Sequence, residues 1–144
     1  RLMRYLLDTN TCIYIIKRKP VEVLRHFQQY HPGDIGISSI TMAELQYGVA
    51  KSRAQKRNAE ALSEFLIPFE ILSFGESATQ AYGSIRALLE RQGNIIGAMD
   101  LLIAAHAVSL DAVLVTNNVK EFARVPDLKI ENWVTLNTID SRSL

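Results

Sequence analysis

Short apolar runs alternate with amphipathic segments along almost the whole of this chain. Runs typical of buried strands lie at 5–7, 35–38, 71–74 and 112–116, with a last edge strand at 128–130. Segments with helical spacing of apolar residues lie between them, at 12–16, 21–30, 39–49, 54–66, 76–92 and 98–110. This alternation predicts an α/β fold in which a parallel sheet is covered by helices on both faces.

The length of 144 residues, 48% of them hydrophobic, is that of one domain with a core of its own. We expect a single domain over residues 3–134, with 1–2 and 135–144 as tails of native or vector origin. Cys12 is the only cysteine and is expected in the core, which excludes an internal disulfide and fits a reducing, cytoplasmic setting. The most apolar run, 101–115, is interrupted by polar residues, so we expect no membrane segment.

Charge is nearly balanced, with 16 Lys and Arg against 15 Asp and Glu, so the overall composition does not point to nucleic acid. Two local basic groups stand out, Lys17-Arg18-Lys19 and the segment 51–57, which includes Lys51 and Arg53. Such groups are usually solvated surface. They become candidates for RNA binding if an acidic site in the same chain acts on nucleic acid, because cations must then hold the phosphate backbone.

Asp8 directly follows the first predicted strand and precedes the small polar residues Thr9 and Asn10. In an open α/β sheet, ligands bind at the carboxyl ends of the strands, which makes Asp8 a candidate site residue. Aspartate is also a preferred helix cap, so Asp8 can equally serve to start the helix that follows. Both interpretations stay open at this point.

Glu44 is an acidic residue at a position where the helical pattern predicts an apolar side chain. Within the predicted helix 39–49, Ile40, Ala43, Glu44 and Tyr47 have helical spacing, which places the glutamate on an apolar face. An ionised glutamate is rarely buried without a partner or a metal. The alternative is a glutamate at the rim of that face, reaching water or an arginine.

Asp100 is the only acidic residue of the apolar helix 98–110 and lies near its N-terminus, where the helix dipole would also favour an acid. If Asp8, Glu44 and Asp100 converge on one pocket, a cation must offset the repulsion between their carboxylates. Oxygen ligands without a neighbouring histidine cluster favour one or two Mg²⁺ or Mn²⁺ ions and make zinc a poor match.

A fourth polar segment, Val115-Thr116-Asn117-Asn118, ends the strand predicted at 112–116. Parallel strands end on the same side of a sheet, so this segment should lie near Asp8 if the two strands are neighbours. A turn with a helix cap is the alternative, because Thr and Asn suit both.

These residues belong to four ordered motifs, namely Leu7-Asp8-Thr9-Asn10, the segment 39–48, Gly97-Ala98-Met99-Asp100, and Val115-Thr116-Asn117-Asn118 with Glu121-Phe122. Together they resemble the PIN-domain ribonucleases and, within that superfamily, the VapC toxins of bacterial toxin–antitoxin pairs. The resemblance spans residues 5–133. It implies a PIN-like α/β/α sandwich with a central, mostly parallel sheet of about four or five strands.

The resemblance also implies an Mg²⁺- or Mn²⁺-dependent endoribonuclease, with Asp8, Glu44 and Asp100 as catalytic metal ligands. Water activated by the metal would hydrolyse a phosphodiester bond, so no side-chain nucleophile is needed. The implied substrate is structured RNA, particularly a tRNA anticodon stem-loop, with initiator tRNA among the candidates. The implied partners are a VapB-type antitoxin whose C-terminal segment blocks the site, and a second toxin copy within a larger complex.

Asn118 departs from the family pattern, because many PIN domains carry an acidic residue at this position. A catalytic role for Asn118 would rest on a neutral amide oxygen, and a second metal would be held weakly. The polar residues expected to orient the ligands by hydrogen bonding are Thr9, Asn10, Thr116 and Asn117.

Two other functions remain open on the sequence. A PIN scaffold that binds RNA or protein without cutting is permitted by the amide at Asn118. A phosphatase of the haloacid dehalogenase type also has an aspartate after its first strand, but it needs a second acid two residues on, where this chain has Asn10.

Overall fold

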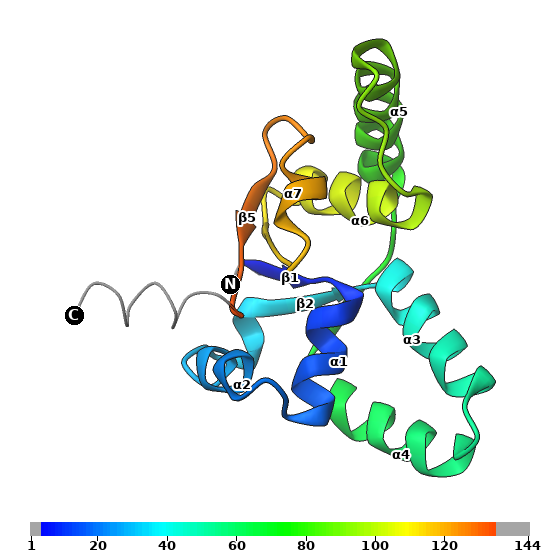
Figure 1. Cartoon of the computed structure of the whole chain (residues 1–144), viewed down its shortest axis with the longest axis vertical. Helices are drawn as coiled ribbons and strands as arrows, with labels where there is room; N and C mark the ends of the chain where they lie inside the picture. The colour runs from blue at the N-terminus through cyan, green and yellow to red at the C-terminus, as the bar shows by residue number, and fades with distance from the viewer. Residues whose placement is uncertain (1–3, 135–144) are drawn as a thin grey trace.

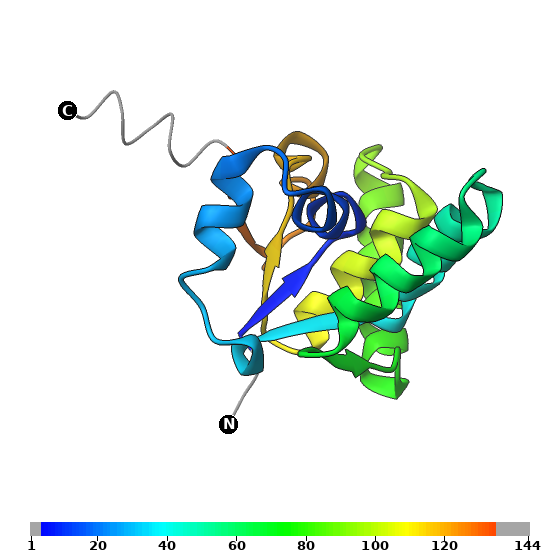
Figure 2. The same ribbon diagram turned by 90° about the horizontal axis from the view of Figure 1, so that it is seen from below.

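The computed structural model describes residues 4–134, which form a five-stranded sheet between two layers of helices (Figure 1). The strands are β1 (Tyr5–Leu7), β2 (Ile35–Ser38), β3 (Glu70–Leu72), β4 (Val113–Val115) and β5 (Lys129–Glu131). All neighbouring pairs are parallel, in the order β3-β2-β1-β4-β5. Figure 2 shows β1, β2 and β4 running across the middle of the molecule. The predicted α/β/α sandwich with a parallel sheet is therefore confirmed.

The helices agree closely with the helical patterns of the sequence. They are α1 (Thr9–Lys17), α2 (Val21–Phe27), α3 (Ser39–Lys51), α4 (Gln55–Leu66), α5 (Glu76–Gln92), α6 (Ala98–Ser109) and α7 (Val119–Phe122). A short 3-10 helix, η1 (Pro32–Asp34), directly precedes β2. Only α7 was not expected, because four residues are too few to show a helical period. The predicted tails at 1–2 and 135–144 lie outside the described residues.

The sheet separates two hydrophobic cores. Leu6 and Leu114 pack on the side of α5 and α6, whereas Tyr5, Leu7 and Val115 pack on the side of α1, α2 and α4. The alternation along β1 follows from the pleat of a strand, which sends successive side chains to opposite faces. Figure 1 shows the two helical layers above and below the strands. No helix within residues 4–134 is long and apolar enough to cross a membrane.

Helix α6 is buried on most of its surface, as its apolar sequence predicts, and it carries the buried His106. The Nδ1 atom of His106 lies 2.8 Å from the Ser38 hydroxyl, which also accepts the Ile40 N–H and so caps α3. Burial lowers the pKa of His106, which keeps this imidazole neutral. The start of α3 is thereby tied to α6.

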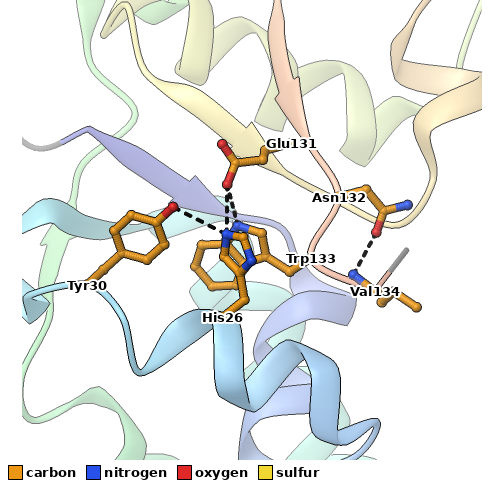
Figure 3. A network of polar contacts seen from close by, with 6 residues as sticks. All are labelled: His26, Tyr30, Glu131, Asn132, Trp133 and Val134. Carbon is orange, nitrogen blue, oxygen red and sulfur yellow. Dashed lines mark hydrogen bonds and ion pairs between the residues drawn. The ribbon is translucent and has the colours of Figure 1, made fainter. Parts of the chain in front are cut away.

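A second polar cluster joins α2 to the end of β5 (Figure 3). The Glu131 carboxylate accepts the indole N–H of Trp133 at 2.7 Å and lies 3.1 Å from Nε2 of His26. The Trp133 ring stacks against both His26 and Tyr30, with centroid separations of 4.8 and 5.5 Å. Trp133 is 1% exposed, so the N–H of its indole needs this internal acceptor.

Candidate active site

Asp8 connects β1 to α1 and performs the capping role considered from the sequence. Its Oδ1 accepts the Thr11 N–H at 2.8 Å, which caps α1, and its own N–H donates to the Val115 carbonyl at 3.0 Å. The second bond fastens Asp8 to the end of β4, the neighbour of β1 in the sheet. The aspartate therefore stands where the strand order reverses, between β1 and β4.

The Asp8 side chain is 6% exposed, and this burial raises the pKa of its carboxyl. The Thr116 hydroxyl and the Thr11 amide oppose the rise through hydrogen bonds, while the nearby Glu44 carboxylate adds to it. A helix cap needs no such desolvation or acidic neighbour. The surroundings of Asp8 therefore include more than a helix cap requires.

Glu44 comes from α3 and accepts a hydrogen bond from the Thr9 hydroxyl, which links α3 to the first turn of α1. Glu44 does not share a buried face with Ala43 and Tyr47, so that prediction from the helical spacing was wrong. The side of α3 that packs into the protein carries Thr41 and Leu45, whereas Ala43 and Tyr47 are exposed. Glu44 flanks the buried side of the helix and is partly covered.

Asp100 lies in the first turn of α6 and faces Glu121 from α7. Burial and the carboxylates of Glu121, Asp8 and Glu44 raise the pKa of Asp100 to about 7. The pKa of Glu121 is lowered, chiefly because the Asp100 side chain hydrogen-bonds to it. The Asp8 and Glu44 carboxylates lie near enough to Asp100 to contribute to this rise in its pKa.

Glu121 is the site residue that sequence reasoning did not select. Its Oε2 accepts the Gly97 N–H at 3.1 Å, and its Oε1 accepts the Asn118 side-chain amide at 2.8 Å. Asn118, the predicted neutral substitute for an acid, thus supports an acid three residues later. The Glu121-Phe122 pair was visible in the sequence, but no element was predicted there that would have turned the glutamate toward Asp100.

The other predicted polar residues divide into two groups. Thr9 and Thr116 hydrogen-bond to the carboxylates of Glu44 and Asp8. Asn10 is exposed on α1, and the Asn117 carbonyl oxygen accepts from Asn132 instead of turning toward an acid. The structure therefore brings the two threonines to the site and leaves the two asparagines at its margin.

The predicted basic residues lie at the far ends of the helices that carry the acids. Lys17 ends α1, Arg18 and Lys19 follow it, Lys51 ends α3, and Arg53 comes just after. All five are exposed. Lys51 and Glu44 are separated by about two helical turns along α3.

A groove of about 360 Å³ runs between α1, α3 and α4. Its wall includes Glu44 together with Lys17 and Lys51, and the apolar side chains that line it are Ile13, Ile16, Leu45, Val49 and Leu62. One continuous surface therefore joins an acid of the site to two of the predicted cations.

The chemistry of the donors at the site fits a divalent metal ion. The four carboxylates offer oxygen ligands of the kind that Mg²⁺ and Mn²⁺ prefer. A cation would offset the burial, and to a smaller extent the repulsion, that raises the pKa values of Asp8 and Asp100. Within residues 4–134, however, no three acidic, histidine or cysteine side chains are grouped so as to hold one ion. Glu44 and Glu121 are held by protein donors, and direct binding would require them to rotate.

Comparison with known proteins agrees with this geometry. The family model of the PIN domain matches residues 5–128. Ribonuclease VapC2 of Rickettsia felis is 48% identical over 132 residues, which cover 91% of this chain and 98% of that protein. The tRNA(fMet)-specific endonuclease VapC of Salmonella typhimurium is 42% identical over 132 residues, which cover 92% of this chain and 99% of that protein.

A solved structure extends the likeness to three dimensions. The crystal structure of VapBC2 from Rickettsia felis, bound to a DNA fragment from their promoter, contains a chain that superposes with a TM-score of 0.85 at 47% identity. The superposition covers 91% of this chain and 99% of that chain.

Proposed function

This chain belongs to the PIN-domain family and, within it, to the VapC ribonucleases, and from that membership we infer that it is a toxin that cleaves RNA and is neutralised by a cognate antitoxin. The observation that carries this function is the gathering of Asp8, Glu44, Asp100 and Glu121 at the carboxyl end of β1 and β4. The phosphatase alternative has no support, because the whole domain matches a nuclease family.

We propose that Asp8, Glu44 and Asp100 hold one or two Mg²⁺ or Mn²⁺ ions, with Glu121 as a further carboxylate. A bound ion of this kind lowers the pKa of water and neutralises charge that develops on a scissile phosphate. The protein would supply the positions of the oxygen ligands, since the hydroxyls of Thr9 and Thr116 orient two of the carboxylates by hydrogen bonding.

The proposed substrate is tRNA, cut in the anticodon stem-loop. Initiator tRNA is the first candidate, because a relative with 42% identity is named a tRNA(fMet)-specific endonuclease. The exposed cations that would hold the phosphate backbone are Lys17, Arg18, Lys19, Lys51 and Arg53. Such contacts make binding weaken as salt rises.

We propose the groove between α1, α3 and α4 as the binding site of the antitoxin. Relatives of this chain occur in solved VapBC complexes. A segment with apolar side chains would pack on Leu45 and Val49 and would reach Glu44 in the same groove. Occupation of this groove would therefore cover one acid of the site, which accounts for neutralisation.

Cleavage of tRNA by the purified protein tests the proposed function. We expect cleavage with Mg²⁺ or Mn²⁺, no products in excess chelator, and recovery when the metal is restored, because the clustered carboxylates need a cation to act on a phosphate. Sequencing the fragment ends would identify both the RNA and the bond cut. Binding of RNA that ignores chelator and gives no products would instead support a PIN scaffold without catalytic activity.

Replacing Glu121 with Gln is expected to lower metal-dependent cleavage by about ten- to a hundredfold, since residues that support a metal site typically contribute that much. The amide oxygen can still accept the Gly97 N–H, but the amide NH2 group cannot accept from Asn118, so the substitution removes the charge next to Asp100 and one hydrogen bond. The measurement is the cleavage rate as a function of Mg²⁺ concentration. Glu90→Gln on the exposed surface of α5 is the matched control. Equal rates for the two variants would remove Glu121 from the site.

A further inference from the structure

Tyr47 is 65% exposed although it is a large aromatic residue on a helix that packs into the protein. Single exposed apolar side chains are common and need no explanation by themselves. The position of Tyr47 is what distinguishes it. It follows Glu44 by three residues on α3, so the two side chains are neighbours on the helix surface, with about 5–6 Å between their Cβ atoms.

Lys51 lies one further turn along the same helix and places its ammonium group 5.1 Å from the centre of the Tyr47 ring. This contact orders the tyrosine ring and puts a positive charge beside it. The same lysine lines the groove that contains Glu44. An acid, an exposed aromatic ring and a cation therefore follow one another along α3.

The same order is found in RNA next to a scissile bond, where a phosphate, a base and a second phosphate follow one another. If Glu44 helps to act on one phosphate, the base of the adjoining nucleotide is within reach of a ring one helical turn away, and the next phosphate is within reach of an ammonium group. Bases stack on aromatic side chains with little preference for sequence, because every base has a π-face. Stacking requires a base that is not already paired inside a duplex.

We propose that Tyr47 is the stacking platform for an unpaired nucleobase adjoining the scissile phosphate, with Lys51 ordering the ring and contacting the backbone. The proposal rests on the proposed function for its substrate. It adds to that function a physical reason for cutting RNA in loops, because paired bases cannot reach the ring. Tyr47 is a positioning residue and takes no part in the chemical step.

The test uses the full chain and an RNA hairpin whose loop the wild-type protein cleaves. Tyr47→Ala is expected to raise KM by about five- to a hundredfold, the range for loss of one base stack, and to change kcat by less than about threefold. Tyr47→Phe and Tyr47→Trp should restore KM, because both keep an aromatic face. Ile67→Ala, which truncates a 79% exposed side chain just after the last residue of α4, should behave as wild type.

A second measurement separates stacking from cleavage. A hairpin with 2-aminopurine in its loop, mixed with protein in excess chelator, should lose fluorescence with wild-type protein and Tyr47→Phe but not with Tyr47→Ala. Because this signal needs no turnover, it could be measured even if the protein did not cleave RNA. Unchanged KM and unchanged quenching in Tyr47→Ala would overturn the proposal. So would an effect of that variant confined to toxin dimerisation or antitoxin binding.

Discussion

Replacing Asp8 with Asn is expected to reduce RNA cleavage by at least about a hundredfold. Charge stabilisation by a metal ion is worth several kcal/mol, and each 1.4 kcal/mol corresponds to a factor of ten in rate. Asp8 is the most buried of the four carboxylates, so solvent water has little access to compensate for the loss of its negative charge. The measurement is the rate of tRNA cleavage in saturating Mg²⁺, together with relief of growth inhibition when the variant is expressed.

The same substitution should leave the fold intact, which is what makes it informative. Asparagine caps helices as well as aspartate does, so the bond from the Thr11 N–H to residue 8 is kept. The free energy of unfolding should change by no more than about 1 kcal/mol. Asp111→Asn is the matched control, since it removes an exposed carboxylate that pairs with Lys129. Full activity in Asp8→Asn would contradict the proposal that Asp8 binds a metal ion.

Much of the fold was predictable because each element carries its own local signal. The helix α5 has the predicted bounds, since apolar spacing marks its body and Gly93, with a φ of 68°, ends it in a left-handed conformation. The parallel sheet followed from the alternation of strands and helices. What the sequence does not contain is which strands are neighbours, and the pairing of β1 with β4 is what brings Thr116 to Asp8.

Glu44 was selected for a reason that the structure overturns. Helical spacing grouped it with Ala43 and Tyr47, but those two side chains are exposed. Periodicity finds the residues that share a face, and it does not say which face meets the core when apolar residues occur on two sides of a helix. The proposed stacking of an RNA base on Tyr47 would explain why α3 exposes an aromatic side chain.

Glu121 shows a different limit of sequence reasoning. It was seen as part of a motif, yet attention went to Asn118 because that residue occupies the familiar position of an acid. The structure has the amide of Asn118 donating to Glu121, so the two residues act as a pair. Glu121 lies within α7 and Asn118 directly precedes that helix, so the acid comes three residues after the position where many PIN domains carry one.

Replacing Trp133 with Ala is expected to cause the largest loss of stability in this protein. The indole is 1% exposed, stacks against His26 and Tyr30, and donates to Glu131 (Figure 3). Truncation of a fully buried aromatic residue costs about 3–5 kcal/mol in lost burial and cavity formation. For a chain of this size, the melting temperature should fall by about 10–15 °C.

Trp133→Phe separates the contribution of the ring from that of the indole N–H. Phenylalanine can keep the stacking on Tyr30 but leaves the Glu131 carboxylate without one donor, which costs about 1–3 kcal/mol when such a partner is removed. The two variants should therefore melt in the order wild type, Phe, Ala, as followed by circular dichroism in urea and on heating. An alanine variant within about 1 kcal/mol of wild type would show that the cluster of His26, Tyr30 and Glu131 does not depend on the indole to hold α2 against the end of β5.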